Sequence, residues 1–307
     1  MRNTFINNLV ERARLDDSII LIVGDLGFNV VEPFQSEFPK RFINAGICEQ
    51  NMASMAAGLA SEGFKVFVYS IANFPTFRCA EQIRNDICYH DLDVTIVSIG
   101  GGFSYGQLGM SHHATEDISI LRAIPNLTVN VPSTLSEVRG AVRQIASVSK
   151  PNYLRLDKSF VDLKTIQEYV FGKATLLEEG SDVTIIVAGG ILEEVLDCSK
   201  KLRELDDINC RILSMHTVKP IDKEAIIKSC EETKAIITVE ENNIVGGLGS
   251  AVAEVIQSSG TKKICFKMIG LQDRFSSIVG DQKYLREKYE ISSNHIYSSV
   301  KKIIQNI

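Results

Sequence analysis

The sequence predicts an α/β protein with two domains, each built on a largely parallel sheet that helices cover. Short apolar runs alternate with amphipathic stretches, which is typical of parallel strands joined by crossover helices. The strand candidates are apolar on both faces, as in Ile-Ile-Leu-Ile-Val at 19–23, so both faces of the sheet should be covered. The length of 307 residues exceeds one ordinary core and fits two domains of about 150 residues each.

The first half of the chain supplies five predicted strands and five predicted helices. The strands are short β-rich runs, at 19–23, 65–69, 94–99, 127–131 and 152–156. The helices show apolar residues at helical spacing, near 4–14, 49–61, 76–88, 117–123 and 135–146. Together they predict a complete α/β domain over residues 1–163.

The pattern changes after this domain and then starts again. Residues 164–179 are mixed and polar, without strand periodicity, and we interpret them as a linker. A second series of strands follows, at 183–187, 211–214, 235–239 and 265–269. Its helices lie near 193–204, 223–230, 250–257 and 294–304. The second domain is therefore predicted to span residues 180–307.

The composition excludes several classes of protein. With 33 Lys and Arg against 38 Asp and Glu, the chain has a net charge of −5 and no basic run, so we expect no nucleic-acid partner. The longest stretch without Asp, Glu, Lys or Arg, residues 94–115, carries five Gly and cannot span a membrane. Seven Cys without a C-x-x-C pair indicate free thiols and no metal site. No signal peptide begins the chain, so we expect a cytoplasmic protein.

Two glycine-rich motifs have alternative interpretations. Gly247-Leu-Gly249 follows a strand and opens a helix, but Val252 replaces the third small residue of a dinucleotide site. We favour a turn that permits close backbone packing. The segment Gly102-Phe-Ser104-Tyr-Gly106 matches the nucleophile elbow of hydrolases, with Ser104 as nucleophile. Gly109 indicates a continued loop in place of the required helix, so a hydrolase is the minor alternative.

The most informative segment is residues 44–58, which places Glu49 at the start of a helix rich in Met, Ala and Gly. Small residues at this density allow another backbone to approach closely. One interpretation is a buried carboxyl group, which can stay protonated because burial raises the pKa of a carboxylic acid. The other is a solvated Glu that the positive end of the helix dipole favours. The segment alone leaves both open.

This segment resembles the G-I-x-E-x-x-M motif in the pyrimidine-binding domain of the transketolase family. Asp25 follows the first strand as in the family's A-D-L, residues 70–85 resemble its aromatic stretch, and residues 106–113 resemble its G-E-D-G-x-[ST]-H loop. Residues 215–222 and 239–250 resemble the family's C-terminal domain. The resemblance covers nearly the whole chain. It implies a pyrimidine-binding parallel-sheet domain followed by a smaller transketolase C-terminal-like α/β domain.

The resemblance implies a thiamine diphosphate site. Glu49 would hydrogen-bond the pyrimidine ring of that cofactor and help to generate its reactive form. Phe74 and Phe77 would line the flat ring, although core packing would also explain two Phe at this spacing. Asp25 and Arg78 would lie near the cofactor, and a strand-end turn is the other explanation for Asp25.

The same resemblance implies a substrate side. His112 would donate a hydrogen bond to the substrate, whereas an adjacent His pair in a polar loop is otherwise often exposed. Lys158 stands where the family has an Arg that binds a sugar phosphate. A Lys keeps the positive charge at this position but cannot form the two parallel hydrogen bonds of a guanidinium group. Gln107 and Leu108 replace the family's Glu-Asp, and Leu108 cannot bind a donor hydroxyl. We therefore expect a donor other than an ordinary pentulose phosphate.

One part of the family is missing from the sequence. In the family, a Gly-Asp-Gly motif and a distant Asn hold Mg²⁺ and the diphosphate. This sequence has no such motif, so the resemblance implies a split enzyme. A separate N-terminal subunit would carry that domain and Mg²⁺, and two copies of each chain would form an α2β2 heterotetramer. The alternatives are the β subunit of a 2-oxo-acid dehydrogenase and a non-catalytic partner chain. Deoxyxylulose phosphate synthase, a single long chain, fits the length less well.

Overall fold

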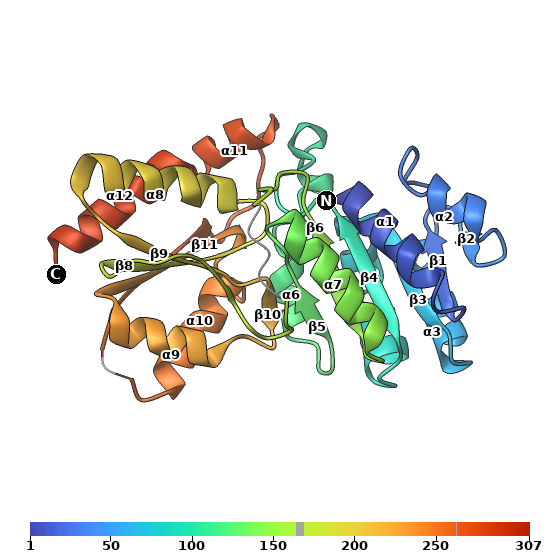
Figure 1. Cartoon of the computed structure of the whole chain (residues 1–307). Coiled ribbons are helices and arrows are strands. Elements are labelled where there is room, and N and C mark those ends of the chain that lie inside the picture. Colours follow the sequence, from blue (N-terminus) through green and yellow to red (C-terminus); the bar gives the residue numbers. More distant parts are fainter. Residues whose placement is uncertain (164–168, 262) are drawn as a thin grey trace.

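The computed structural model describes residues 1–163, 169–261 and 263–307, which form two α/β domains side by side (Figure 1). Helices cover both faces of each sheet, so the predicted fold class is confirmed. Among the helices that the structure describes, none has both the length and the apolar character needed to cross a membrane. The proposed division at 1–163, 164–179 and 180–307 stays a prediction, and residues 164–168 of its linker lie outside the described residues.

The sheet of the first domain has seven strands in the order β10-β5-β6-β4-β3-β1-β2. All its pairs are parallel except that of β10 with β5. The strands are β1 (Ile19–Val23), β2 (Phe42–Asn44), β3 (Lys65–Ile71), β4 (Val94–Ile99), β5 (Thr128–Asn130), β6 (Asn152–Leu156) and β10 (Thr217–Lys219). Strand β10 comes from the second half of the chain, so the sheet crosses the boundary expected from the sequence pattern.

The helices of the first domain are α1 (Arg2–Ala13), α2 (Glu32–Glu37), α3 (Glu49–Ser61), α4 (Asn73–Arg78), α5 (Ala80–Gln82), α6 (Asp117–Arg122) and α7 (Leu135–Ser147). Helix α7 begins with a capping box, in which the side chains of Thr134 and Glu137 each accept the other residue's backbone N–H. The single helix predicted at 76–88 is wrong. Cys79 leaves the helical region (φ −109°, ψ 13°), and a π-helical turn follows at Ile83–Cys88.

The sheet of the second domain has five strands in the order β12-β11-β8-β9-β7, and only the β7–β9 pair is antiparallel. These are β7 (Thr175–Glu178), β8 (Val183–Ala188), β9 (Cys210–Ser214), β11 (Ala235–Asn243) and β12 (Cys265–Leu271). Helices α8 (Leu192–Asp206) and α12 (Ser293–Gln305) pack together on one face (Figure 1). Helices α9 (Lys223–Glu232) and α10 (Leu248–Ser258) cover the other, and α11 (Gln282–Lys288) lies near the joint.

Apolar and ionic contacts fix the two domains to each other. One apolar core contains residues of both sheets, such as Val129 of β5 and Leu213 of β9. Arg155 of β6 is fully buried at the joint, where its guanidinium lies 3.0 Å from Asp117 and 3.0 Å from Asp157. Arg155 also donates a 3.0 Å hydrogen bond to the backbone carbonyl of Glu241 in β11, and this bond ties the buried cluster to the second domain.

Candidate functional site

The candidate site lies at the carboxyl ends of β1 to β4, where parallel sheets commonly bind ligands. Glu49 is the first residue of α3, directly beyond the loop that follows β2. Its carboxylate is only 4% exposed and lies 2.9 Å from Nη1 of Arg78. The interpretation of Glu49 as a solvated residue of the first helical turn, which the sequence left open, is therefore wrong. Glu49 is buried and paired.

Small residues around Glu49 explain how it is held. Gly46 has φ +77°, a left-handed conformation that favours glycine, and turns the chain into α3. Met52 and Ala56 of α3 face the core and are fully buried. A pocket of about 600 Å³, which we call the Glu49 pocket, opens in front of the carboxylate; it is lined by Ile47, Cys48, Glu49, Gln50, Asn51 and Arg78.

Aromatic side chains stand next to Arg78. The guanidinium carbon of Arg78 lies 4.2 Å from the centre of the Phe74 ring, a cation–π contact. The ring of His112 meets Phe74 edge-on at 5.2 Å between centroids. Phe77, one turn away on α4, is 45% exposed. The structure thus brings together Glu49, Arg78, Phe74 and His112, while Phe77 presents a free apolar face.

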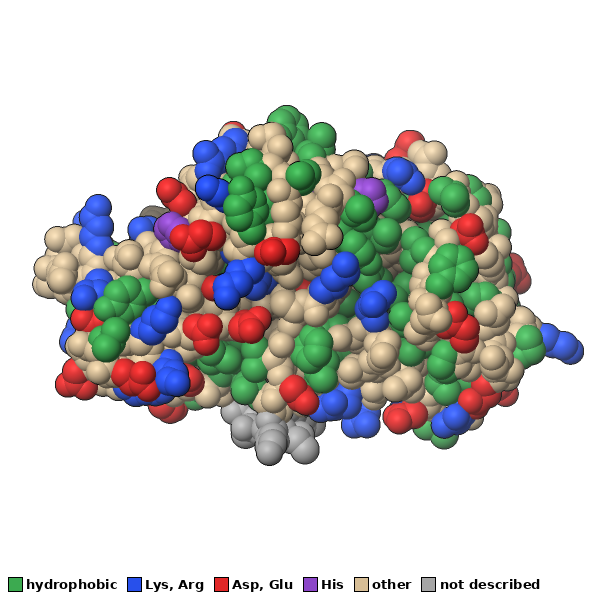
Figure 2. Space-filling model, turned by 90° about the horizontal axis from the view of Figure 1, so that it is seen from above, with side chains coloured by type: hydrophobic (Ala, Val, Ile, Leu, Met, Phe, Trp, Pro, Cys, Tyr) green, Lys and Arg blue, Asp and Glu red, His purple; other side chains and the backbone are tan. Residues whose placement is uncertain are grey.

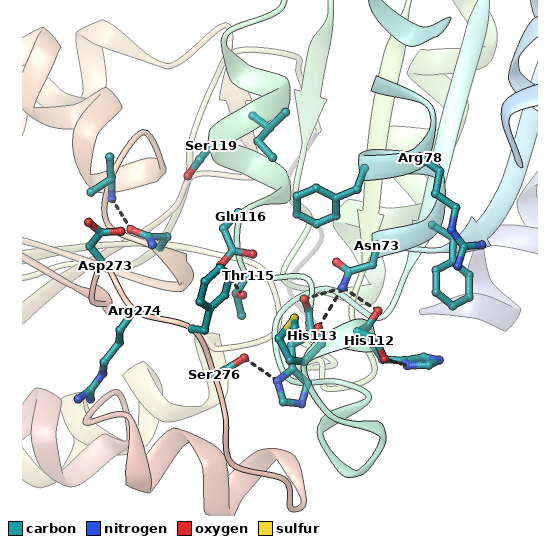
Figure 3. Close-up of a pocket in the computed structure, with 18 residues that line it drawn as sticks. Asn73, Arg78, His112, His113, Thr115, Glu116, Ser119, Asp273, Arg274 and Ser276 are labelled. Carbon is teal, nitrogen blue, oxygen red and sulfur yellow. Dashed lines mark hydrogen bonds between the residues drawn. The ribbon is translucent and has the colours of Figure 1, made fainter. Parts of the chain in front are cut away.

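A second cavity of about 860 Å³, the interdomain cleft, lies between the two domains. Figure 3 shows that Asn73, Arg78 and His112 enter its wall from the first domain, and Asp273 and Ser276 from the second. Arg78 lines the interdomain cleft as well as the Glu49 pocket, so the two cavities meet at its side chain. Glu116 lines the cleft too, and burial raises the pKa of this carboxyl group.

The adjacent histidines have different surroundings. His112 is partly exposed, with Nδ1 3.0 Å from the Ser111 hydroxyl. Partial burial and the charges of His113 and Arg78 lower the pKa of His112, so its ring is neutral at pH 7. His113 is buried, with Nδ1 2.7 Å from the Ser276 hydroxyl and Nε2 3.0 Å from the Gly106 carbonyl. His112 can therefore meet a ligand, whereas His113 holds structure.

The other substrate candidates lie near Tyr105. The Lys158 ammonium is 3.8 Å from the centre of the Tyr105 ring. Partial burial and then the charge of Arg2 lower the pKa of Lys158. Gln107 and Leu108 are both exposed on a 3₁₀ turn, Gly106–Leu108. The centre of the Tyr105 ring lies 6.5 Å from that of His112, so Tyr105 stands between His112 and Lys158. No pattern in the sequence indicated that Tyr105 belongs to the site.

Asp25 lies just after the end of β1 and is hydrogen-bonded to Asn44 at the end of the neighbouring strand β2. It has φ +53°, and its carboxylate accepts a 3.0 Å hydrogen bond from the Asn44 side chain. The Asn44 side-chain oxygen in turn accepts hydrogen bonds from the backbone N–H groups of Asp25 and Gly46, both at 3.0 Å. Asp25 is exposed and supports the turn that leads to Glu49.

Both glycine-rich motifs have structural explanations. Ser104 donates its hydroxyl to the Gly101 carbonyl at 2.8 Å and accepts from the Lys158 N–H, and a 3₁₀ turn follows it in place of a helix. The hydrolase alternative is therefore wrong. The close-packing interpretation of Gly247-Leu-Gly249 is confirmed, because a Cβ at Gly247 would meet the backbone carbonyl oxygen of Asn243 at 2.7 Å.

The sequence missed one polar residue of the site. Asn73 begins α4, and its side-chain amide donates to the carbonyls of Ser111 (3.1 Å) and His113 (2.8 Å) (Figure 3). It thereby ties α4, which carries Phe74 and Phe77, to the loop that carries His112. A polar residue two positions after a buried strand was the available signal. Among the described residues, no group of three or more His, Cys, Asp or Glu side chains could hold a metal ion.

Comparison with known proteins assigns both halves of the chain. Residues 1–162 match the model of the transketolase pyrimidine-binding domain, and residues 172–296 match that of the transketolase C-terminal domain. The chain is 37% identical to a subunit of the apulose-4-phosphate transketolase of Phocaeicola vulgatus, over 89% of this chain and 87% of the relative. It is 34% identical to the 6-deoxy-6-sulfo-D-fructose transketolase subunit SqwH of a Clostridium species, over 99% and 94%.

Solved structures agree with these matches. A split-gene transketolase, described as an inactive β4 tetramer, superposes with a TM-score of 0.88 at 35% identity, over 99% of this chain and 97% of that chain. Transketolase from Leishmania mexicana shares the fold, with a TM-score of 0.81 at 19% identity, and this chain covers 45% of it.

Proposed function

Since the chain belongs to the transketolase family, we propose that it is the C-terminal subunit of a split enzyme that transfers a two-carbon ketol unit between sugars. The observation that carries this proposal is Glu49. A carboxylate that is 4% exposed, yet lines a pocket of about 600 Å³, is placed to meet a ligand. Among the described residues its ion-pair partner is the half-exposed Arg78, which can move aside.

The family implies thiamine diphosphate, and the residues around Glu49 fit its pyrimidine ring. A carboxylate can exchange a proton with a ring nitrogen, and the half-exposed face of Phe77 can cover a flat ring. When bound, the cofactor supplies the nucleophilic carbon that ketol transfer requires. Arg78 and Asp25 complete our proposed cofactor-binding set, with Arg78 pairing Glu49 and Asp25 supporting the turn before it.

On the substrate side, we assign His112 to hydrogen-bond the ketose and Lys158 to attract an anionic group at its far end. The neutral ring of His112 can donate to a developing oxyanion. Gln107 can bind a hydroxyl group, but Leu108 cannot. The donor that we propose is therefore a specialised sugar other than an ordinary pentulose phosphate, because the hydroxyl that the family's Asp binds would find no partner at Leu108. The sugars named for the two relatives, apulose 4-phosphate and 6-deoxy-6-sulfofructose, support a donor of this kind.

The partner that we propose is an N-terminal subunit with the diphosphate-binding domain and its Mg²⁺, in an α2β2 heterotetramer. Figure 2 shows hydrophobic side chains gathered beside a histidine on the face seen from above. Exposed apolar residues near the site are Ile47, Phe77, Leu108, Met110 and Phe275, and a second chain would cover such a surface. The β4 tetramer described as inactive supports the need for a partner. Seven free cysteines support a cytoplasmic location.

Purification of the tagged chain from its native source tests the proposal. We expect a second subunit with a Gly-Asp-Gly motif to copurify, and the complex to transfer a ketol unit when thiamine diphosphate and Mg²⁺ are added. Pyruvate serves as a second substrate, because its decarboxylation would identify a 2-oxo-acid dehydrogenase instead. Ketol transfer by the purified single chain would contradict the split-enzyme proposal.

A further inference from the structure

The loop of residues 101–113, which we call the His112 loop, leaves its own domain and enters the other. It follows β4 of the first sheet, yet Phe103 is fully buried in the core of the second domain. There the Phe103 ring stacks on Tyr289, with 5.1 Å between the ring centres. The loop that carries His112 is thus anchored in the neighbouring domain.

Glu241, near the end of β11, holds the base of this loop. Its carboxylate is 1% exposed and accepts a 2.6 Å hydrogen bond from the Phe103 N–H. Arg286 and Gln282 of α11 donate to the same carboxylate at 2.7 and 2.9 Å. The fit is tight, because a Cβ at Gly102 (φ +58°) would meet Glu241 Cγ at 2.6 Å.

The second domain also holds the far end of the loop. Ser276, in the segment that follows β12, lies 2.7 Å from His113 Nδ1 (Figure 3). In the same segment, the Gly280 N–H donates to the Gly106 carbonyl at 3.3 Å. Between these anchors, the side chains of Gln107 and Leu108 are exposed and that of His112 is partly exposed.

We propose that Glu241 of the second domain is a positioning residue for His112, acting through the Phe103 N–H and the base of the His112 loop. It does not touch the substrate. A hydrogen bond to an ionised acceptor is about twice as strong as a neutral one, so the negative charge of Glu241 matters as well as its shape. The role of the loop in ketol transfer rests on the proposed function, whereas its anchoring does not. The second domain thereby has a task in the reaction that we propose for the enzyme.

Hydrogen exchange measured by mass spectrometry on the purified chain tests the anchoring. In Glu241→Gln, which preserves the side-chain shape, we expect amides of residues 101–113 to exchange about 10-fold faster or more. Glu178→Gln is the matched control, since Glu178 also accepts a hydrogen bond in the second domain, from Ser199, but has no contact with the loop. Ser276→Ala, which removes a single hydroxyl group, should loosen residues 106–113 even if Glu241→Gln folds poorly. Unchanged exchange of the loop in the folded variants, or an equal rise throughout the second domain, would overturn the proposal.

Kinetics of the assembled enzyme separate positioning from general destabilisation. Glu241→Gln should lower kcat/KM for the ketose by about 10-fold while the affinity for thiamine diphosphate, titrated by fluorescence, changes less than about 2-fold. Equal losses in both quantities would indicate a merely structural role. Failure of the wild-type complex to transfer any ketol unit would refute the proposed function and leave the exchange result standing.

Discussion

The carboxylates of two glutamates lie at the start of helices that follow parallel strands, and their surroundings are opposite. Glu240, near the end of β11, is fully enclosed and accepts hydrogen bonds from the Leu248 and Gly249 N–H groups of α10, at 2.7 and 2.8 Å. Glu49 faces an open pocket and pairs with Arg78. The protein's own carboxylate thus fills the position at α10 that an anionic ligand would take. At α3 the carboxylate is left available to a ligand.

The difference predicts that Glu49 matters for activity and the enclosed groups for stability. In the complete enzyme, Glu49→Gln should lower kcat by about 100-fold to 10,000-fold, because a neutral amide cannot exchange a proton with the cofactor. Ketol transfer at saturating substrate measures the loss. Glu62→Gln, at the other end of α3 and exposed, is the control and should retain activity. Full activity of Glu49→Gln would favour the non-catalytic alternative.

Among the buried charged groups, we expect the largest loss of stability when Arg155 is replaced. Replacing it with Ala leaves Asp117 and Asp157 as buried carboxylates without their partner, so the free energy of unfolding should fall by about 3–5 kcal/mol. Urea denaturation followed by circular dichroism measures this. Arg14→Ala breaks an exposed pair with Glu37 and should cost less than about 1 kcal/mol. Similar losses for the two variants would contradict the distinction.

Glu240 predicts a pH dependence. Burial raises the pKa of this carboxyl group from its ordinary value of 4.5 to about 7, although two backbone N–H groups and nearby Arg charges oppose the rise. The folded protein therefore holds a proton that the unfolded chain releases at lower pH. The free energy of unfolding should fall as pH rises from about 4.5 to about 7, by about 3 kcal/mol at most, and then level off.

Glu240→Gln should flatten this slope, as urea denaturation at several pH values between about 5 and 8 would measure. The slope should persist in part, because burial also raises the pKa of Asp117 and of Glu137. Glu254→Gln is the matched control, since Glu254 lies on the exposed side of α10 and its pKa is lowered by Arg122. An unchanged slope in Glu240→Gln would show that this carboxylate does not carry the dependence.

The sequence predicted the helices and strands that are determined by local residue patterns. The strands at 19–23, 94–99 and 152–156 and the helix at 49–61 have the predicted bounds, since apolar runs and helical spacing are strong signals. The three-residue strands β2 and β10 and the four-residue β7 were missed, because such short strands depend on pairing with distant neighbours.

The candidate site divides in the same way. The segment around Glu49 drew attention to it, but its burial and its pair with Arg78, 29 residues further along the chain, depend on the contact between two helices. The position of the His112 loop depends on Glu241, 138 residues beyond Phe103, and nothing in the spacing reveals that contact. Local pattern left the burial of Glu49 open and the family resemblance pointed to it, while the groups that hold the site come from long-range packing.

The smallest expected effect concerns substrate choice at the open site. Leu108 is 55% exposed in the same loop as His112, at the position where the family has an Asp that binds a donor hydroxyl. Leu108→Asp should raise kcat/KM for xylulose 5-phosphate by about 10-fold, because it supplies a charged acceptor for that hydroxyl. Met110→Asp adds the same charge two residues away, at a similarly exposed position, and should give no gain. If wild type already uses xylulose 5-phosphate at ordinary transketolase efficiency, or if both variants gain equally, Leu108 does not set the choice of donor.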